Sequence, residues 1–329
     1  MTLRTTILAL ALASALATPA MARDLLAGEV DTEIPAIPGV VGEDADWDIA
    51  WMGPMAADGM ATAPDGRLLF AQEQSNAIWA LWPDGQSFVE VPYVLGAGAV
   101  SVDGQGRMIA VERACSDPGL SAMTCNKVSA VVLLSPARTV IADHQADGSP
   151  LGRLNDVQAD GHGGAWFTEG ALWHTDAAGN VSRVAEAENF TNGLVLSPDG
   201  RTLYVTDRMA ILAFDVGADA SLSNRRTFAT LGDTQGFGGD GMTVDADGRL
   251  YVTGDAGVYV YAPDGAQLGV IPVPRRSITL AFAGPDRRTL LVGALGAVTP
   301  AGEAWVPAEG VRNIAMTIYA IPTLAAGVR

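Results

Sequence analysis

The sequence has little positive charge, few cysteines and no long apolar run after its first residues. Lys and Arg together number 20 against 37 Asp and Glu, and Lys127 is the sole lysine. The formal net charge of −17 excludes a nucleic-acid-binding surface, because the summed field repels phosphate groups. Beyond residue 22, no stretch approaches the roughly 18 apolar residues of a membrane span. A membrane-spanning segment is therefore not expected.

The first residues have the pattern of an export signal. Arg4 supplies the basic start, an apolar run extends from Ile7 to Ala17, and Ala20-Met21-Ala22 fits the small-residue cleavage rule. We expect residues 1–22 to be a cleaved signal peptide and residues 23–329 to form one domain. The expected location is the periplasm or the medium.

The two cysteines, Cys115 and Cys125, lack the Cys-x-x-Cys spacing of a redox or zinc site. In the oxidising compartment that export implies, we expect them to form a disulfide. Two free, non-catalytic thiols are the alternative. A disulfide closing so short a loop would stabilise the protein by about 2–3 kcal/mol and do no chemistry.

A unit of an apolar strand, a turn rich in Asp and Gly, and a second apolar strand recurs six times. Spacings of 40, 57, 37, 48 and 39 residues separate the last turn residues of these units, which are Gly66, Gly106, Gly163, Gly200, Gly248 and Arg287.

A period near 40 predicts one four-stranded antiparallel sheet per unit, and glycine supplies the positive φ that such turns need. The fold class predicted is all-β, a six-bladed β-propeller around a central channel. The alternative, a two-sheet sandwich, does not explain the period. The terminal segments, roughly Arg23 to Met55 and Ala301 to Arg329, should complete and close the ring.

Polar residues precede four of the units at equivalent positions: Asp58, Asn155, Asn192 and Asp240. Because the innermost strand of each blade leads to loops at the mouth of the channel, we expect these side chains to converge there. Two carboxylates and two carboxamides supply the oxygen donors that Ca²⁺ prefers and that Mg²⁺ or Mn²⁺ accept. Each Asx-Gly pair alone is also an ordinary turn dipeptide.

The blocks around these residues are more specific than the turns. They read Arg153-Leu154-Asn155-Asp156, Thr191-Asn192-Gly193-Leu194 and Asp240-Gly241-Met242. In this order and spacing they resemble the regucalcin/gluconolactonase (senescence marker protein-like) family of six-bladed β-propellers, over about Asp58 to Val292. The resemblance implies a lactonase that uses one divalent metal ion, Ca²⁺ first, with Zn²⁺, Mg²⁺ or Mn²⁺ as alternatives.

The resemblance also implies roles for single residues. Asp58, Asn192 and Asp240 would be metal ligands, and Asn155 would ligate the metal, lie beside it or bind substrate. Arg153 would contact substrate oxygens. Asp240 would also orient or deprotonate the attacking water.

One position departs from the family pattern. The family usually has a Glu-Gly-Pro block where this chain has Asp58-Gly59-Met60. An Asp side chain is one methylene shorter, so it would draw its loop inward or bind through water. Glu73 could compensate, although we expect a solvated or blade-edge position for it.

The implied chemistry is hydrolysis of a lactone of a sugar acid or a related small cyclic ester. A divalent cation polarises the carbonyl and a carboxylate takes a proton from water. The sequence contains no Gly-x-Ser-x-Gly elbow, the motif that carries a nucleophilic serine in many hydrolases. The alternatives are a non-catalytic propeller that binds a small ligand or a protein, and a related esterase or organophosphate hydrolase. The sequence does not specify the lactone or the oligomeric state.

Overall fold

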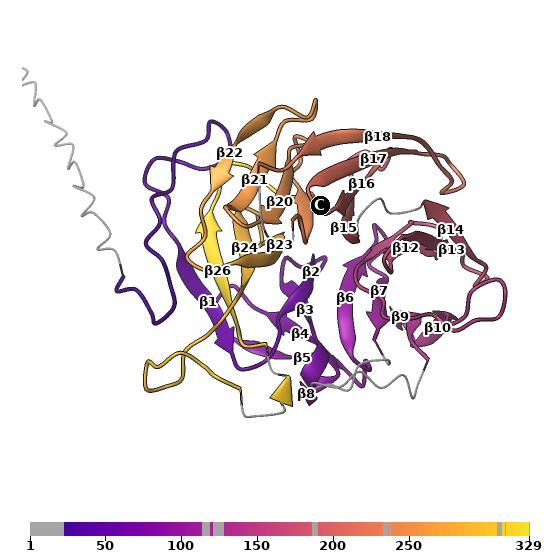
Figure 1. Ribbon diagram of the computed structural model, residues 1–329, viewed down its shortest axis with the longest axis horizontal. Helices are drawn as coiled ribbons and strands as arrows, with labels where there is room; N and C mark the ends of the chain where they lie inside the picture. The colour runs from indigo at the N-terminus through magenta and orange to yellow at the C-terminus, as the bar shows by residue number, and fades with distance from the viewer. Residues whose placement is uncertain are drawn as a thin grey trace, which may run out of the picture.

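Six four-stranded antiparallel sheets are arranged as blades around a central axis (Figure 1). The computed structural model describes residues 23–113, 119–120, 128–185, 190–232, 236, 238–307, 311–312 and 314–328. Within these ranges the helical content is one 3₁₀ turn, η1 (Glu73–Ser75), and no helix is long and apolar enough to cross a membrane. The predicted six-bladed β-propeller is confirmed.

Each blade is named by its strands from the axis outward. Blade 1 has β2 (Asp58–Thr62), β3 (Leu68–Gln72), β4 (Ala77–Leu81) and β5 (Ser87–Pro92). Blade 2 has β6 (Ala97–Val102), β7 (Met108–Glu112), β9 (Ala130–Ser135) and β10 (Thr139–Ala142). Blade 3 has β11 (Val157–Ala159), β12 (Ala165–Thr168), β13 (Leu172–Thr175) and β14 (Val181–Ala185).

Blade 4 has β15 (Thr191–Leu196), β16 (Thr202–Asp207), β17 (Ala210–Val216) and β18 (Leu222–Thr230). Blade 5 has β19 (Met242–Val244), β20 (Leu250–Gly254), β21 (Gly257–Tyr261) and β22 (Gln267–Ile271). Blade 6 has β23 (Ser277–Ala283), β24 (Thr289–Leu295), β26 (Met316–Pro322) and β1 (Asp48–Gly53). A separate pair joins β8 (Gly119–Leu120) to β25 (Val311–Arg312).

The turn between the first and second strands is alike in every blade. Its last residue has positive φ in all six cases, with φ values of 90°, 76°, 103°, 69°, 83° and 55° at Gly66, Gly106, Gly163, Gly200, Gly248 and Arg287. Five of the six are glycine, the residue that adopts this conformation at least cost. At Arg287 the side chain donates to the carbonyl oxygen of Val328, a contact that a glycine could not make.

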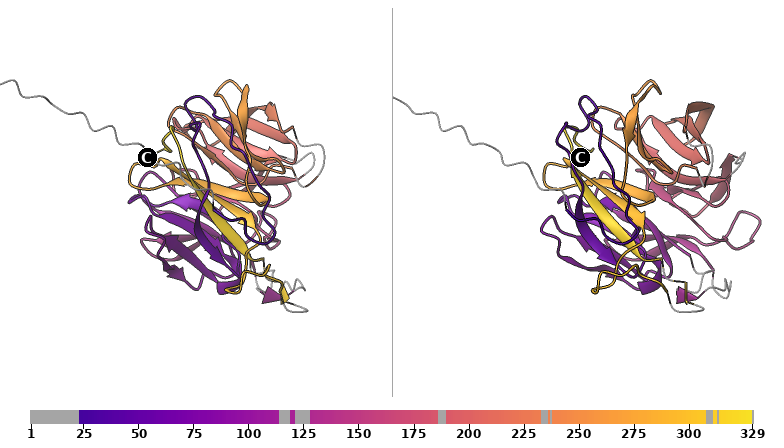
Figure 2. Two further views of the ribbon diagram at one scale, coloured as in Figure 1. Left: turned by 90° about the vertical axis from the view of Figure 1, so that its left-hand side faces the viewer. Right: turned by 60° about the vertical axis from the view of Figure 1, so that its left-hand side comes forward.

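The sixth blade joins the two ends of the chain. Strand β1, from the N-terminal segment, pairs antiparallel with β26, with Met52 opposite Thr317, and the two lie side by side in both views of Figure 2. The expectation that the terminal segments complete the ring is confirmed.

The core is divided into apolar layers between neighbouring sheets rather than gathered at the axis. Leu69 and Ile78 of blade 1, for example, share a fully buried cluster with Ala110 and Val132 of blade 2. Because each sheet is covered on both faces by its neighbours, the six inner strands stay in a ring and leave a channel between them. The predicted signal peptide, residues 1–22, and the predicted disulfide partners Cys115 and Cys125 lie outside the described residues.

Candidate active site at one mouth of the channel

The predicted site residues lie at one end of the channel, which we call the site mouth. Asp58 begins β2 and Asn192 lies near the start of β15, while Asn155 and Asp240 lie two residues before β11 and β19. In an antiparallel pair, the start of one strand lies beside the end of its partner. The residues that follow the second strand of each blade therefore reach the same mouth.

Close packing of the blades explains the Asx-Gly pairs at these strand starts. Strand pairing is irregular between Asp58 and Ala61 and again between Thr191 and Leu194, and such bulges redirect side chains next to functional sites. The intervening glycines leave no room for a side chain. A Cβ on Gly59 would lie 2.2 Å from Ala99 Cα, and a Cβ on Gly193 would lie 2.3 Å from the Asp240 carbonyl oxygen.

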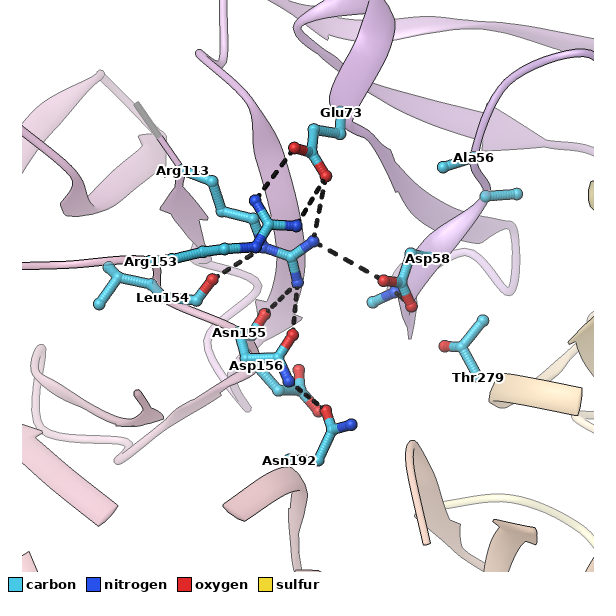
Figure 3. Close-up of polar contacts among 12 residues, drawn as sticks. Ala56, Asp58, Glu73, Arg113, Arg153, Leu154, Asn155, Asp156, Asn192 and Thr279 are labelled. Carbon is cyan, nitrogen blue, oxygen red and sulfur yellow. Dashed lines mark hydrogen bonds and ion pairs between the residues drawn. The ribbon is translucent and has the colours of Figure 1, made fainter. Parts of the chain in front are cut away.

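Contacts around Arg113 bring several of the predicted residues together (Figure 3). The Arg113 Nη2 group donates to both the backbone oxygen and Oδ1 of Asn155, each at 2.8 Å. Its Nη1 lies 3.8 Å from Asp58 Oδ2. The Asn155 side-chain amide in turn donates to Asn192 Oδ1. Asp58, Asn155 and Asn192 are thus connected through one buried guanidinium.

Asp240 lies close enough to this group for the charges of its members to act on the Asp240 carboxylate. Burial raises the pKa of Asp240 well above its usual value, and the charges of Asp58 and Asp156 raise it further. Its main chain is fixed by the Thr206 hydroxyl, which donates to the Asp240 carbonyl oxygen at 3.2 Å. The structure therefore places all four predicted polar residues around one mouth.

Arg113 extends the site beyond the residues that the sequence names, and Glu73, named there as a residue that could compensate for Asp58, lies beside it. Glu73 accepts two hydrogen bonds from Arg153, at 3.1 and 3.2 Å, and one from Arg113 at 3.4 Å. Its side chain is 9% exposed, so the expected solvated or blade-edge position is wrong. Both Glu73 and Arg113 directly follow the second strand of their blades, β3 and β7, and this shared position is the signal that could have found them.

Asp156 is a further acid, half-buried, that the sequence does not single out. Its Oδ1 accepts the Val157 backbone N–H at 2.8 Å and its Oδ2 that of Leu194 at 3.3 Å. Burial raises the pKa of Asp156 to about 7, and the charge of Asp58 adds to the shift. Burial likewise raises the pKa of Asp58, against the opposing charge of Arg113.

Arg153 lies at the outer side of this group. Its guanidinium is bound to Glu73, yet the side chain is 28% exposed. Arg153 is therefore oriented by a buried carboxylate while remaining accessible to a molecule that enters the mouth. Behind the mouth, a cavity of about 140 Å³ lined by residues including Met60, Asp156 and Thr279 continues the channel.

The donor set fits a divalent cation on chemical grounds. Asp58, Asn192 and Asp240 offer only oxygen atoms, which hard cations prefer. The charges of Asp58 and Asp156 raise the pKa of Asp240, and the charge of Asp58 raises the pKa of Asp156. Negative charge gathered in this way is what a bound cation neutralises. Asn155 Oδ1 accepts from Arg113 and Asn192 Oδ1 accepts from Asn155, so a bound ion would take the place of a hydrogen bond at either amide oxygen. Among the described residues, no group of three or more His, Cys, Asp or Glu side chains is arranged to hold a metal, and the fit rests on the amide oxygen of Asn192.

Fold and mouth together define a six-bladed β-propeller with an oxygen-rich polar centre at one end of its channel. The chain belongs to the SMP-30/gluconolactonase/LRE-like family, whose model matches residues 59–295. The family predicted from the sequence blocks is therefore confirmed.

Curated relatives match parts of the chain. The gluconolactonase of Zymomonas mobilis is 34% identical over 113 residues, which cover 31% of this chain and 32% of that protein. Regucalcin of Danio rerio is 29% identical over 174 residues, covering 47% of this chain and 58% of its own length. These matches span between about a third and somewhat over half of the relatives' length.

Solved structures share the fold over nearly the whole chain. A gluconolactonase of Xanthomonas campestris superposes with a TM-score of 0.68 at 21% identity and covers 90% of this chain and 96% of its own. A regucalcin of Agrobacterium tumefaciens, described as a calcium-binding protein, gives a TM-score of 0.62 at 20% identity over 87% of this chain and 96% of its own. At these identities the likeness establishes the fold alone.

Proposed function

We propose that the protein is an exported, divalent-metal-dependent hydrolase that opens a lactone of a sugar acid or a related small cyclic ester. The observation that carries the proposal is the convergence of Asp58, Asn155, Asn192 and Asp240 on one mouth of a family propeller. Asp58, Asn192 and Asp240 would hold the ion, with Ca²⁺ as the first candidate. When bound there, the cation would polarise the ester carbonyl.

The chain's own residues account for the remaining steps. Arg153, oriented by Glu73, would bind oxygen atoms of the substrate through its exposed guanidinium edge. Asp240 would take a proton from the attacking water. Addition of water and cleavage of the ring C–O bond give a hydroxy acid, so no covalent enzyme intermediate is required.

Asp240→Ala tests this function directly. We expect lactone opening, followed by pH-stat after chelation and calcium readdition, to fall at least about 100-fold, with the circular dichroism spectrum unchanged. Asp264→Ala is the matched control, because Asp264 lies in a turn of the same blade and is exposed. Full activity in Asp240→Ala would remove Asp240 from the mechanism.

A second candidate reaction is hydrolysis of an organophosphate. Diisopropyl-fluorophosphatase of Loligo vulgaris is 25% identical over 172 residues, covering 44% of this chain and 53% of its own length. A panel of aldonolactones, aryl esters and fluorophosphates assayed with one protein preparation separates the two reactions. Calcium-dependent turnover of none of these would favour a non-catalytic binding propeller.

Export is proposed from the N-terminal pattern of Arg4, the apolar run and Ala20-Met21-Ala22. N-terminal sequencing of the protein from fractionated cells tests it. The expected first residue is Arg23 in the periplasmic or extracellular fraction. An intact Met1 in the cytoplasm would contradict the proposal.

A further inference from the structure

A positively charged side chain of the protein lies inside the predicted metal-ligand group. Arg113 is 4% exposed, and its Nη2 engages Oδ1 of Asn155 at 2.8 Å. Its Nη1 stands 3.8 Å from Asp58 Oδ2. Both oxygen atoms belong to the residues expected to serve a metal ion, so the guanidinium and a cation would draw on the same negative charge.

Main-chain contacts fix the guanidinium in this place. The Arg113 Nε donates to the carbonyl oxygen of Leu154 at 2.8 Å, and Nη2 also donates to the backbone oxygen of Asn155 at 2.8 Å. A Cβ on Gly98 would lie 2.3 Å from Arg113 Nε, so this position of blade 2 requires a glycine beside the side chain. The inner strand of blade 2 starts with Ala97 where blades 1 and 5 provide Asp58 and Asp240.

The Arg113 guanidinium lies near two carboxylates, those of Glu73 and Asp58. The Nη1 group lies between Glu73 Oε2, at 3.4 Å, and Asp58 Oδ2, at 3.8 Å (Figure 3). Arg153 binds the same Glu73 carboxylate through both of its terminal nitrogens, but no contact of Arg153 with Asp58 or Asn155 is among these bonds. The two arginines therefore share Glu73 and differ in their contact with the predicted ligands.

We propose that Arg113 is a built-in competitor of the divalent cation, which lowers the affinity of the site mouth for calcium by engaging Asn155 Oδ1 and the charge of Asp58. The inference rests on the ligand set of the proposed function. Two cations close to the same carboxylate repel each other, and the repulsion is stronger here than in bulk water because Arg113 is buried. Glu73 moderates the competition, because it holds part of the guanidinium charge away from Asp58.

Calorimetric titration of the full-length mature protein with calcium chloride alone tests the proposal. Arg113→Met should lower the Kd for Ca²⁺ about tenfold or more, since it removes the competing charge and frees Asn155 Oδ1. Arg153→Met is the matched control, because it removes the same charge from the same Glu73 without a contact to Asn155, and its charge acts on Asp58 less strongly than that of Arg113. It should change the Kd less than about threefold. Equal or weaker calcium binding by folded Arg113→Met would overturn the proposal.

Glu73→Gln provides a second test that keeps the shape of the side chain. With less of its charge held by Glu73, Arg113 should compete more strongly, so the Kd for Ca²⁺ should rise several-fold, opposite in sign to Arg113→Met. The loss of the Glu73 charge near Asp58 acts in the same direction. If Arg113→Met does not fold, an unchanged or lower Kd in Glu73→Gln still contradicts the proposal.

Calorimetry also separates this inference from the proposed function. If the wild type opens no lactone but Arg113→Met binds calcium more tightly than the wild type, the proposal that Arg113 competes with calcium is supported and the proposed lactonase activity is rejected. If the wild type opens lactones and has the same calcium affinity as Arg113→Met, the proposed lactonase activity is supported and the proposal that Arg113 competes with calcium is rejected.

Discussion

Asp156 illustrates how the surroundings, rather than the residue type, set the chemistry of one side chain. In the sequence it is the last residue of Arg153-Leu154-Asn155-Asp156, with nothing to distinguish it from a turn aspartate. In the folded protein, burial raises its pKa to about 7 from 3.8. Between these two pH values the unfolded chain carries the ionised form while the folded protein retains the proton.

This difference makes stability depend on pH in a definite direction. Because the pKa is raised on folding, the contribution of Asp156 is full below about pH 4 and is lost as the pH rises towards 7, by up to about 1.4 kcal/mol per pH unit. Asp156→Asn removes the titrating proton. In urea unfolding with a chelator present, we expect the variant to lose less free energy of unfolding between pH 5 and pH 7 than the wild type. An identical loss in both proteins would show that Asp156 is ionised in the folded state.

The same contrast between sequence and surroundings explains which site residues could be predicted. Asp58, Asn192 and Asp240 stand at equivalent points of a repeat that is visible in the sequence. The position of a residue in this repeat determines at which end of the channel the residue lies. Arg113 shares with Glu73 only its position directly after a second strand, and these two partners lie 40 residues apart in the chain. Their contact depends on how two neighbouring blades pack. The residues that carry the oxygen donors could therefore be predicted from the sequence. The arginine that lies beside them, Arg113, could not.

At the scale of the element, the starts of the inner strands combine packing with function. Gly193 follows Asn192 because the next blade presents the Asp240 carbonyl oxygen 2.3 Å from where a Cβ would lie. The glycine lets two predicted ligands approach from neighbouring blades. Its role is thus a close approach of two main chains, and not a turn.

Gly193→Ala should therefore affect both stability and metal binding. We expect a loss of about 1–3 kcal/mol in the free energy of unfolding, as is usual for overpacking, and weaker calcium binding because the Asp240 segment must move. Gly104→Ala is the matched control, since a Cβ there meets nothing within 4 Å. Urea unfolding and calorimetry measure the two effects. A variant as stable as the Gly104 control would show that the blades can separate at no cost.

The strand-turn-strand units were the most predictable elements. Their turns need positive φ, and a requirement on the main chain leaves a residue-type mark that can be read without any knowledge of the fold. The bulge between Thr191 and Leu194 leaves no comparable mark. It arises where the inner strand of blade 4 meets its neighbours, so only the assembled ring reveals it.

At the scale of the whole molecule, closure of the ring depends on β26. This strand pairs with β24 on one side and with β1 on the other, so it joins the N-terminal segment to the rest of blade 6. Ala320 lies opposite Asp48 of β1 and Leu291 of β24. A proline at this position removes a main-chain donor from an interior strand.

Ala320→Pro should therefore destabilise the whole ring. We expect a loss at or above the upper end of the usual range of about 0.5–3 kcal/mol for a single substitution, with faster proteolysis of the N-terminal segment. Ser182→Pro is the control, because Ser182 is exposed on β14, the outermost strand of blade 3. Urea unfolding and limited proteolysis measure the outcome. If the two prolines lower the free energy of unfolding equally, pairing of β26 with β1 and β24 contributes no more to stability than pairing of an outermost strand.

A sheet assembled from both chain termini also has a consequence for biosynthesis. Until Met316–Pro322 has left the ribosome, β24 and β1 both lack the strand that lies between them. Unpaired edges of this kind recruit strands from other molecules. The newborn polypeptide is thus exposed to aggregation until β26 has taken its place, and a chaperone would protect it best during that interval.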